Sequence, residues 1–252
     1  MERQLVTNHI LNKIKIDIST YIIVLLSFLA GYFEYTFLTI IFILVHEMGH
    51  FVTGIILKLN VKEIRVFFFG GVTVLEEDLN LCIYKEILLI IMGPVIQILF
   101  YLLIYVFYCN GYVSITTFNK VKLVNQILLG FNLLPILPLD GGKILNNVLD
   151  IFLPYNLSHV ICIIVSIMSV PLIFLFDNKF LVIALVLSLI IKIYNEITSH
   201  KYRVNKLMLE RKLKHVKHCK NELFVSNNKV KRNVTYYKIV NDERVFDYEY
   251  NY

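Results

Sequence analysis

The amino-acid sequence predicts an all-α polytopic membrane protein with about six transmembrane helices, a short membrane-associated β-hairpin and a small cytoplasmic C-terminal tail. Hydrophobic residues make up 57% of the 252 residues, above the roughly 45–50% usual in soluble domains. They are concentrated in long apolar runs that short polar segments separate. A basic stretch, residues 201–232, follows the last run, as is typical of the cytoplasmic side of a membrane.

Six apolar runs are predicted to cross the membrane as helices, the last two being short ones that local adjustment of the bilayer tolerates. They comprise residues 18–33, 35–57, 81–108, 121–139, 160–176 and 180–194. Gly93-Pro94 lies inside the third run, which we expect to tilt or kink there. The fourth run ends in a proline-broken stretch, LLPILPLDGG.

Residues 60–79 have a different character. β-Branched and aromatic residues stand on both sides of Gly70-Gly71, which is typical of a β-hairpin. The segment is too short and too charged to span a bilayer as a helix.

An even number of spans places both termini on one side of the membrane. Arg3, Lys13 and Lys15 flank the first run, and the basic tail follows the last, so both ends are predicted to be cytoplasmic. The net charge of +6 is not accompanied by a nucleic-acid-binding motif, so we expect the lipid bilayer, and no nucleic acid, as a partner.

Two parts are predicted: a six-span membrane domain, residues 1–196, and a basic cytoplasmic C-terminal extension, residues 197–252. In the extension, residues 197–217 indicate a polar helix, and Val234–Val240 indicates a strand. Its role stays open between binding of substrate, of lipid or of an adaptor and a simply solvated, charged surface.

The second apolar run contains His46-Glu47-Met48-Gly49-His50, the pattern HExxH. Residues four apart share one face of a helix, so both imidazoles can reach one zinc ion while Glu47 acts as base on its water. Charged groups at bilayer depth cost roughly 3 kcal/mol each, and a bound zinc compensates for that cost. The alternative, two core histidines hydrogen-bonded to neighbours, does not explain the glutamate.

A catalytic zinc needs a third protein ligand, and Asp140 is the candidate. It follows Pro138-Leu139 at the end of an apolar run and precedes Gly141-Gly142, which permit a tight bend. Non-helical backbone at membrane depth is tolerated where it lines a protein cavity. The alternative is a helix-end aspartate at the membrane surface.

HEMGH in a span, a glycine-containing hairpin, a span with Gly-Pro and NLLPILPLDGG together resemble the site-2 protease family of intramembrane metalloproteases, and most of all its sporulation branch. The resemblance covers roughly residues 1–196. It implies a catalytic core at residues 35–142 and Zn²⁺ held by His46, His50 and Asp140.

The resemblance also implies cleavage of a membrane-associated protein within or near the bilayer, in that branch a sigma-factor precursor. The location implied is the bacterial cell membrane or the mother-cell-derived forespore membrane, where membrane partner proteins inhibit the enzyme. Asn132 matches a substrate-positioning asparagine, and Gly70 and Gly71 match a loop that pairs with an extended substrate.

The sequence departs from the family pattern in two places. Gln97 stands where the family's GPxxN has asparagine, so an amide is kept that is one methylene longer. The tail is too short for the nucleotide-sensing domain pair that sporulation members often carry, so nucleotide control is not carried over. A metal transporter and a catalytically idle binding protein of the same fold are the alternative functions. The spans show one polar cluster, whereas a transporter needs a relay.

Overall fold

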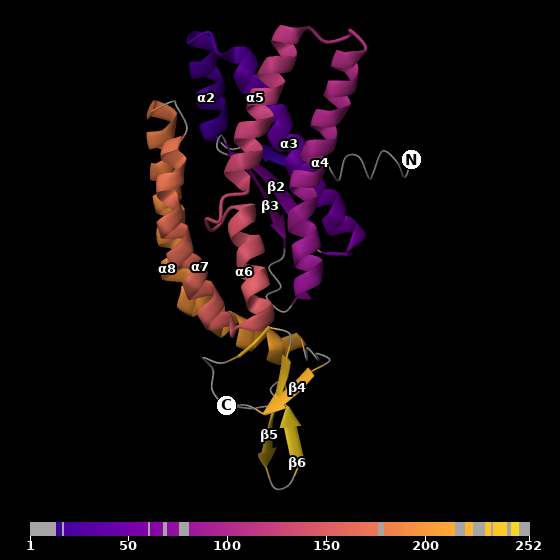
Figure 1. The fold of residues 1–252 in the computed structure, drawn as a ribbon. Helices are drawn as coiled ribbons and strands as arrows, with labels where there is room; N and C mark the ends of the chain where they lie inside the picture. Colours follow the sequence, from indigo (N-terminus) through magenta and orange to yellow (C-terminus); the bar gives the residue numbers. More distant parts are fainter. Residues whose placement is uncertain are drawn as a thin grey trace. The chain divides into compact units, whose positions relative to one another are not determined.

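The structure is a computed structural model that describes residues 14–16, 18–59, 61–67, 70–75, 81–175, 179–214, 220–223, 230–232, 234–240 and 243–246. This part of the chain is mostly helical, with seven α-helices and two three-stranded sheets (Figure 1). The sheets are a correction to the all-α prediction. Each sheet contains one antiparallel pair of neighbouring strands and one parallel strand that comes from earlier in the chain.

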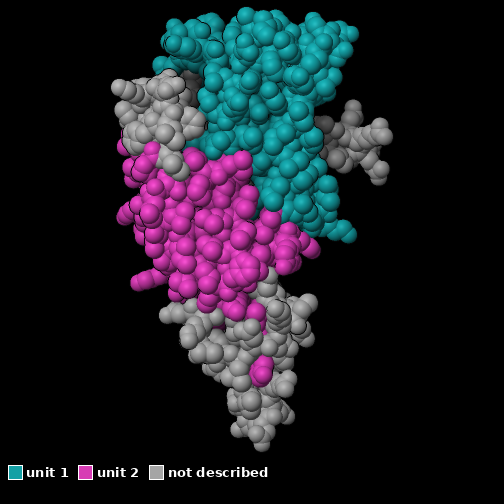
Figure 2. Space-filling model, in the orientation of Figure 1, with its two compact units in different colours: residues 1–77, 88–132 teal, residues 78–87, 133–252 magenta. Residues whose placement is uncertain are grey.

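The chain forms two compact units (Figure 2), residues 1–77 with 88–132 and residues 78–87 with 133–252. Helix α8, Lys179–Lys214, runs without a break through the predicted boundary at residue 196. Residues on both sides of that boundary therefore lie in the second unit, and the division into two domains there stays a prediction.

The first unit is built on long helices: α2 (Ile18–Leu29), α3 (Phe33–Ile56), most of α4 (Ile83–Cys109) and α5 (Ile115–Asn132). Helix α3 packs against α5 around buried Phe42, Val121 and Val124. Helix α4 continues through Pro94, and α5 ends at Asn132, before the prolines.

The first unit also holds a small sheet in the order β1-β2-β3. Strands β2 (Val61–Phe67) and β3 (Gly70–Leu75) pair antiparallel, and Phe67 lies opposite Gly70. The two glycines therefore begin the second strand. The turn, residues 68 and 69, lies outside the described residues, so the hairpin turn and its membrane association stay predictions. Strand β1 (Ile14–Ile16) pairs parallel with β2 and was not predicted.

Two helices of the described chain, α3 and α4, are long and apolar enough to cross a membrane, and α7 is a shorter apolar helix. The other predicted spans are helical too, in α2, α5 and α8, but they are shorter or less apolar. The count of six transmembrane helices therefore stays a prediction.

The second unit contains the remaining elements. They are α6 (Asp140–Phe152), α7 (Tyr155–Ser169), the 3-10 helix η1 (Val170–Leu175), α8, β4 (Lys220–Leu223), β5 (Val234–Val240) and β6 (Glu243–Phe246). The strand predicted at Val234–Val240 is confirmed, as the central strand of a sheet in the order β4-β5-β6.

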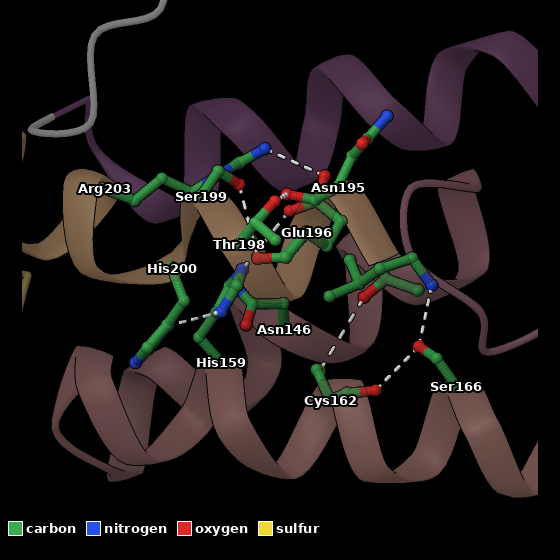
Figure 3. A network of polar contacts seen from close by, with 12 residues as sticks. Asn146, His159, Cys162, Ser166, Asn195, Glu196, Thr198, Ser199, His200 and Arg203 are labelled. Atoms are coloured by element: carbon green, nitrogen blue, oxygen red, sulfur yellow. Dashed lines mark hydrogen bonds and ion pairs between the residues drawn. The ribbon is translucent and has the colours of Figure 1, made fainter. Parts of the chain in front are cut away.

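Polar side chains join α7 to α8 (Figure 3). His200 Nε2 lies 2.7 Å from Asn156 Oδ1 and its Nδ1 lies 2.9 Å from His159 Nδ1. Because an amide oxygen only accepts, His200 Nε2 carries the proton, and in neutral His200 the Nδ1 accepts from His159. His159 Nε2 of α7 also lies 3.5 Å from Glu196 Oε2 of α8, and Arg203, on the same helix as Glu196, donates to Glu196 Oε1 at 2.8 Å.

Candidate metal centre

Helix α3 carries the HExxH residues on its buried side. His46, Glu47 and His50 are all buried. Each offers one potential ligand atom, and these three atoms lie within 4.8 Å of one another. The two imidazoles lie one helical turn apart, and their Nε2 atoms are separated by 3.1 Å. The structure thus brings together the two histidines and the glutamate predicted from the pattern.

The backbone of α4 determines which nitrogen of His50 is available. His50 Nδ1 lies 2.9 Å from the carbonyl oxygen of Leu89. A carbonyl only accepts, so Nδ1 carries the hydrogen, and in the neutral ring Nε2 carries a lone pair. Histidine ligands of metals are oriented in this way, by donation of the other ring N–H to an acceptor.

Gln97 orients His46 in the same manner. Its Oε1 lies 3.0 Å from His46 Nδ1, while its Nε2 donates to Asn125 Oδ1 at 3.0 Å and to the Asn125 carbonyl at 3.3 Å. Gln97 is fully buried, and its amide is used at both ends. The amide retained at this departure from the family pattern therefore holds His46. Asn125, on α5, was missed by the sequence reasoning.

Two glycines let α4 approach the histidines. A Cβ atom at Gly93 would lie 2.3 Å from His50 Nε2 and 2.9 Å from His46 Nε2, and a Cβ at Gly49 would lie 2.5 Å from the carbonyl oxygen of Met92. No side chain fits at either position without displacing these groups. The Gly-Pro element of α4 and the glycine inside HExxH are thus required by the close contact of the two helices.

The donor set fits a zinc ion. Two nitrogens each about 2.05 Å from a tetrahedral zinc are separated by about 3.3 Å, close to the 3.1 Å between the two Nε2 atoms. In the neutral rings both atoms carry lone pairs, which repel at this distance unless a proton or a cation lies between them. Neutral imidazole and carboxylate are also the ligands that zinc uses in catalytic sites.

Asp140 belongs to the second unit, whereas the two histidines belong to the first. It is the first residue of α6, it is buried, and Lys143 Nζ lies 3.8 Å from its Oδ1. Its assignment as the third ligand stays a prediction.

The glycines after Asp140 lie inside α6, not in a bend. A Cβ at Gly141 would come 2.2 Å from the Leu133 carbonyl oxygen, and one at Gly142 would come 2.5 Å from the Ile136 carbonyl carbon. They are needed because the start of the helix lies directly on the preceding proline-containing segment.

The predicted substrate-binding residues lie in two places in the first unit. Asn132 is the half-buried last residue of α5. Gly70 and Gly71 are the first residues of β3, paired with Phe67 and Val66 of β2. In the described part of the chain, no strand pairs with the other edge of β3.

Comparison with known proteins gives three curated relatives. The chain is 30% identical over 147 residues to stage IV sporulation protein FB of Bacillus subtilis. It is 28% identical over 117 residues to a putative zinc metalloprotease of Synechocystis and 29% identical over 116 residues to a zinc metalloprotease of Methanocaldococcus jannaschii. The aligned regions cover 58%, 42% and 43% of this chain. The chain spans 51%, 28% and 32% of the relatives' lengths.

The fold is similar to the solved structure of the site-2 protease from Methanocaldococcus jannaschii, with a TM-score of 0.56 at 22% identity. The match covers 73% of this chain and 89% of that one. The chain is thus similar in sequence to zinc metalloproteases and in fold to a site-2 protease. No protein-family model matches the chain.

The similarity to a site-2 protease agrees with the two membrane-length apolar helices, since one of them carries HExxH and the other the Gly-Pro element. The sequence reasoning found the HExxH and Gly-Pro elements. It missed Asn125 and the Leu89 carbonyl, because an asparagine in an apolar run and a backbone oxygen carry no local pattern.

Proposed function

We propose that the chain is an intramembrane zinc metalloprotease that cleaves a membrane-associated protein within or near the bilayer. In this proposal His46, His50 and Asp140 hold Zn²⁺, and Glu47 is the catalytic base. The observation that carries it is the arrangement of the two Nε2 atoms 3.1 Å apart, with each Nδ1 beside an oxygen acceptor and Glu47 alongside.

His46, His50 and Asp140 would hold the zinc ion, which when bound would lower the pKa of a water molecule and polarise the scissile carbonyl. Gln97 and the Leu89 carbonyl accept from the two Nδ1–H groups and so leave both Nε2 lone pairs available to a metal. Glu47 accepts a proton from the attacking water and passes it to the leaving amine nitrogen, which balances the hydrolysis of the peptide bond. Buried surroundings strengthen these electrostatic interactions.

The substrate backbone must be extended to reach the site. The outer edge of β3, which starts at Gly70 and Gly71, offers main-chain groups for the addition of a substrate strand. Strand β1 already pairs with the opposite edge of the sheet, on β2, so we expect the substrate to add to β3. Asn132, at the end of α5, is assigned to substrate positioning from the family resemblance.

The substrate class we propose is a sigma-factor precursor processed during sporulation, since the chain resembles the sporulation branch and is 30% identical to stage IV sporulation protein FB over the aligned region. The proposed location is the bacterial cell membrane or the mother-cell-derived forespore membrane, with both termini cytoplasmic. Inhibitory membrane proteins are the expected partners.

Reconstitution of the full chain in liposomes with a membrane-tethered candidate substrate tests the proposal. Glu47→Gln should lower the cleavage rate by at least about 100-fold, the usual contribution of a general base, while bound zinc is retained. The matched control is Glu34→Gln on the same helix, where the exposed Glu34 carboxylate pairs with Lys120. We expect this variant to cleave as the wild type does.

Equal cleavage by the wild type and Glu47→Gln would contradict the protease assignment. Zinc flux that responds to Glu47→Gln in the absence of cleavage would favour the transporter. Zinc binding with neither cleavage nor flux would favour an idle binding protein.

A further inference from the structure

We propose that Arg232, in the C-terminal extension, is a positioning residue of the metal centre, because it holds the far end of the helix that begins with Asp140. This inference rests on the proposed function, in which Asp140 is a zinc ligand.

The Arg232 guanidinium contacts side chains of two helices, α6 and α4. Its Nη1 donates to Asn147 Oδ1 at 2.9 Å and to Asp150 Oδ2 at 3.2 Å, and its Nη2 donates to Glu86 Oε2 at 2.5 Å. Asn147 and Asp150 lie in the last two turns of α6, and Glu86 lies in the first turn of α4. Only 3% of Arg232 is exposed, so the extension inserts a charged side chain against α6.

The segment that carries Arg232 is itself fixed. The buried Arg211 guanidinium of α8 donates to the carbonyl oxygens of Lys231, Arg232 and Val234 at 2.6, 3.0 and 2.9 Å. The Tyr155 N–H donates to the Val230 carbonyl at 2.9 Å. Val230 and Val234 also pack with Tyr155 and Leu207 in a buried apolar cluster. The guanidinium of Arg232 is thus presented to α6 from a rigid support.

The other end of α6 is held by close packing. Gly141 and Gly142 leave no room for a Cβ atom above the backbone of residues 133–137, and the Leu137 N–H donates to Ser166 Oγ of α7 at 2.8 Å. A helix of 13 residues is about 20 Å long and rigid. With its start seated on this segment, a displaced far end tilts the helix about the glycine contact and moves Asp140.

Loss of the guanidinium displaces that far end. Removal of one partner of a buried ion pair typically leaves a buried charge whose cost is several kcal/mol. Asp150 would keep hydrogen bonds from Ser158 Oγ and Asn146 Nδ2, and Asn147 Oδ1 would lose the hydrogen bond from Arg232. The simplest way to hydrate the unpaired Asp150 and Asn147 side chains is a movement of the C-terminal end of α6 toward water.

The test measures the zinc dissociation constant of the full-length protein in detergent, by competition with a chromophoric chelator. We expect Arg232→Met to weaken zinc binding by at least about tenfold. The matched control is Arg203→Met, which removes the Arg203–Glu196 pair between α8 residues of the same unit. We expect this control to bind zinc as the wild type does, and Asn147→Ala, a milder change, to give an intermediate loss.

The Asp140→Asn background separates positioning from general destabilisation. If Arg232 acts through Asp140, Arg232→Met changes the zinc dissociation constant of Asp140→Asn by less than about twofold. Equal weakening by Arg232→Met in both backgrounds, or wild-type zinc affinity in both Arg232→Met and Asn147→Ala, overturns the inference. A wild-type protein that binds no zinc overturns instead the proposed function on which it rests.

Discussion

Gly93→Ala isolates the contact between α4 and the two histidines. The added Cβ would lie 2.3 Å from both Cε1 and Nε2 of His50 and 2.9 Å from Nε2 of His46. Ordinary contacts between carbon and nitrogen begin near about 3.5 Å, so the His50 ring must move by about 1 Å. Metal–ligand distances tolerate only about 0.2 Å, and a misplacement of about 1 Å at an active site can cost about 100-fold in rate.

The assay is zinc affinity and cleavage rate of the purified variant, with Gly130→Ala as the control. Gly130 lies in α5 of the same unit, and a Cβ there meets nothing within 4 Å. Gly130→Ala should keep zinc and activity and gain roughly 0.5–1 kcal/mol of helix stability. Wild-type zinc affinity and activity in Gly93→Ala would refute the reasoning, because the imidazoles would then not lie where the close approach places them.

Three further changes have defined outcomes. Gln97→Ala should weaken zinc binding by about 10–100-fold, since it removes the acceptor of His46 Nδ1–H. Gln97→Asn should lose less zinc affinity than Gln97→Ala. Equal zinc affinities of the wild type and Gln97→Ala in chelator competition would contradict this role of Gln97. Gly141→Ala should lower the melting temperature, because its Cβ would come 2.2 Å from the Leu133 carbonyl oxygen, and an unchanged melting temperature would show that the start of α6 is not seated there. Burial raises the pKa of Asp150 from 3.8 to about 6, although Arg232 and Ser158 lower it. Between these two pH values the folded chain therefore binds more protons than the unfolded chain. The free energy of unfolding then falls by about 3 kcal/mol as the pH rises from about 4 to about 6. Thermal unfolding across that range should lose this slope in Asp150→Asn, and an unchanged slope would assign it to another group.

The elements of the site that follow a local pattern were predictable from the sequence. His46 and His50 share a face because four residues complete about one helical turn, and Val234–Val240 forms a strand as its β-branched and aromatic residues indicate. The contacts of Gln97 were not predictable, since its partners His46 and Asn125 are 51 and 28 residues away.

The tail shows the same limit. Its basic residues left open whether the extension is simply solvated, yet Arg211 and Arg232 are buried and paired with carbonyls and carboxylates. The sequence does not show whether a charged side chain is buried, because the groups that compensate its charge belong to other helices and strands. Strand β1 was missed for a related reason, since three residues at the N-terminus become a strand only beside β2.

Zinc K-edge absorption of the purified wild-type protein tests the central claim most directly. The account predicts one zinc ion per chain with two imidazole nitrogens and carboxylate oxygen in its coordination shell, and no sulfur. A protein that retains no zinc, or a zinc bound by sulfur of the cysteines Cys82, Cys109, Cys162 or Cys219, would contradict it.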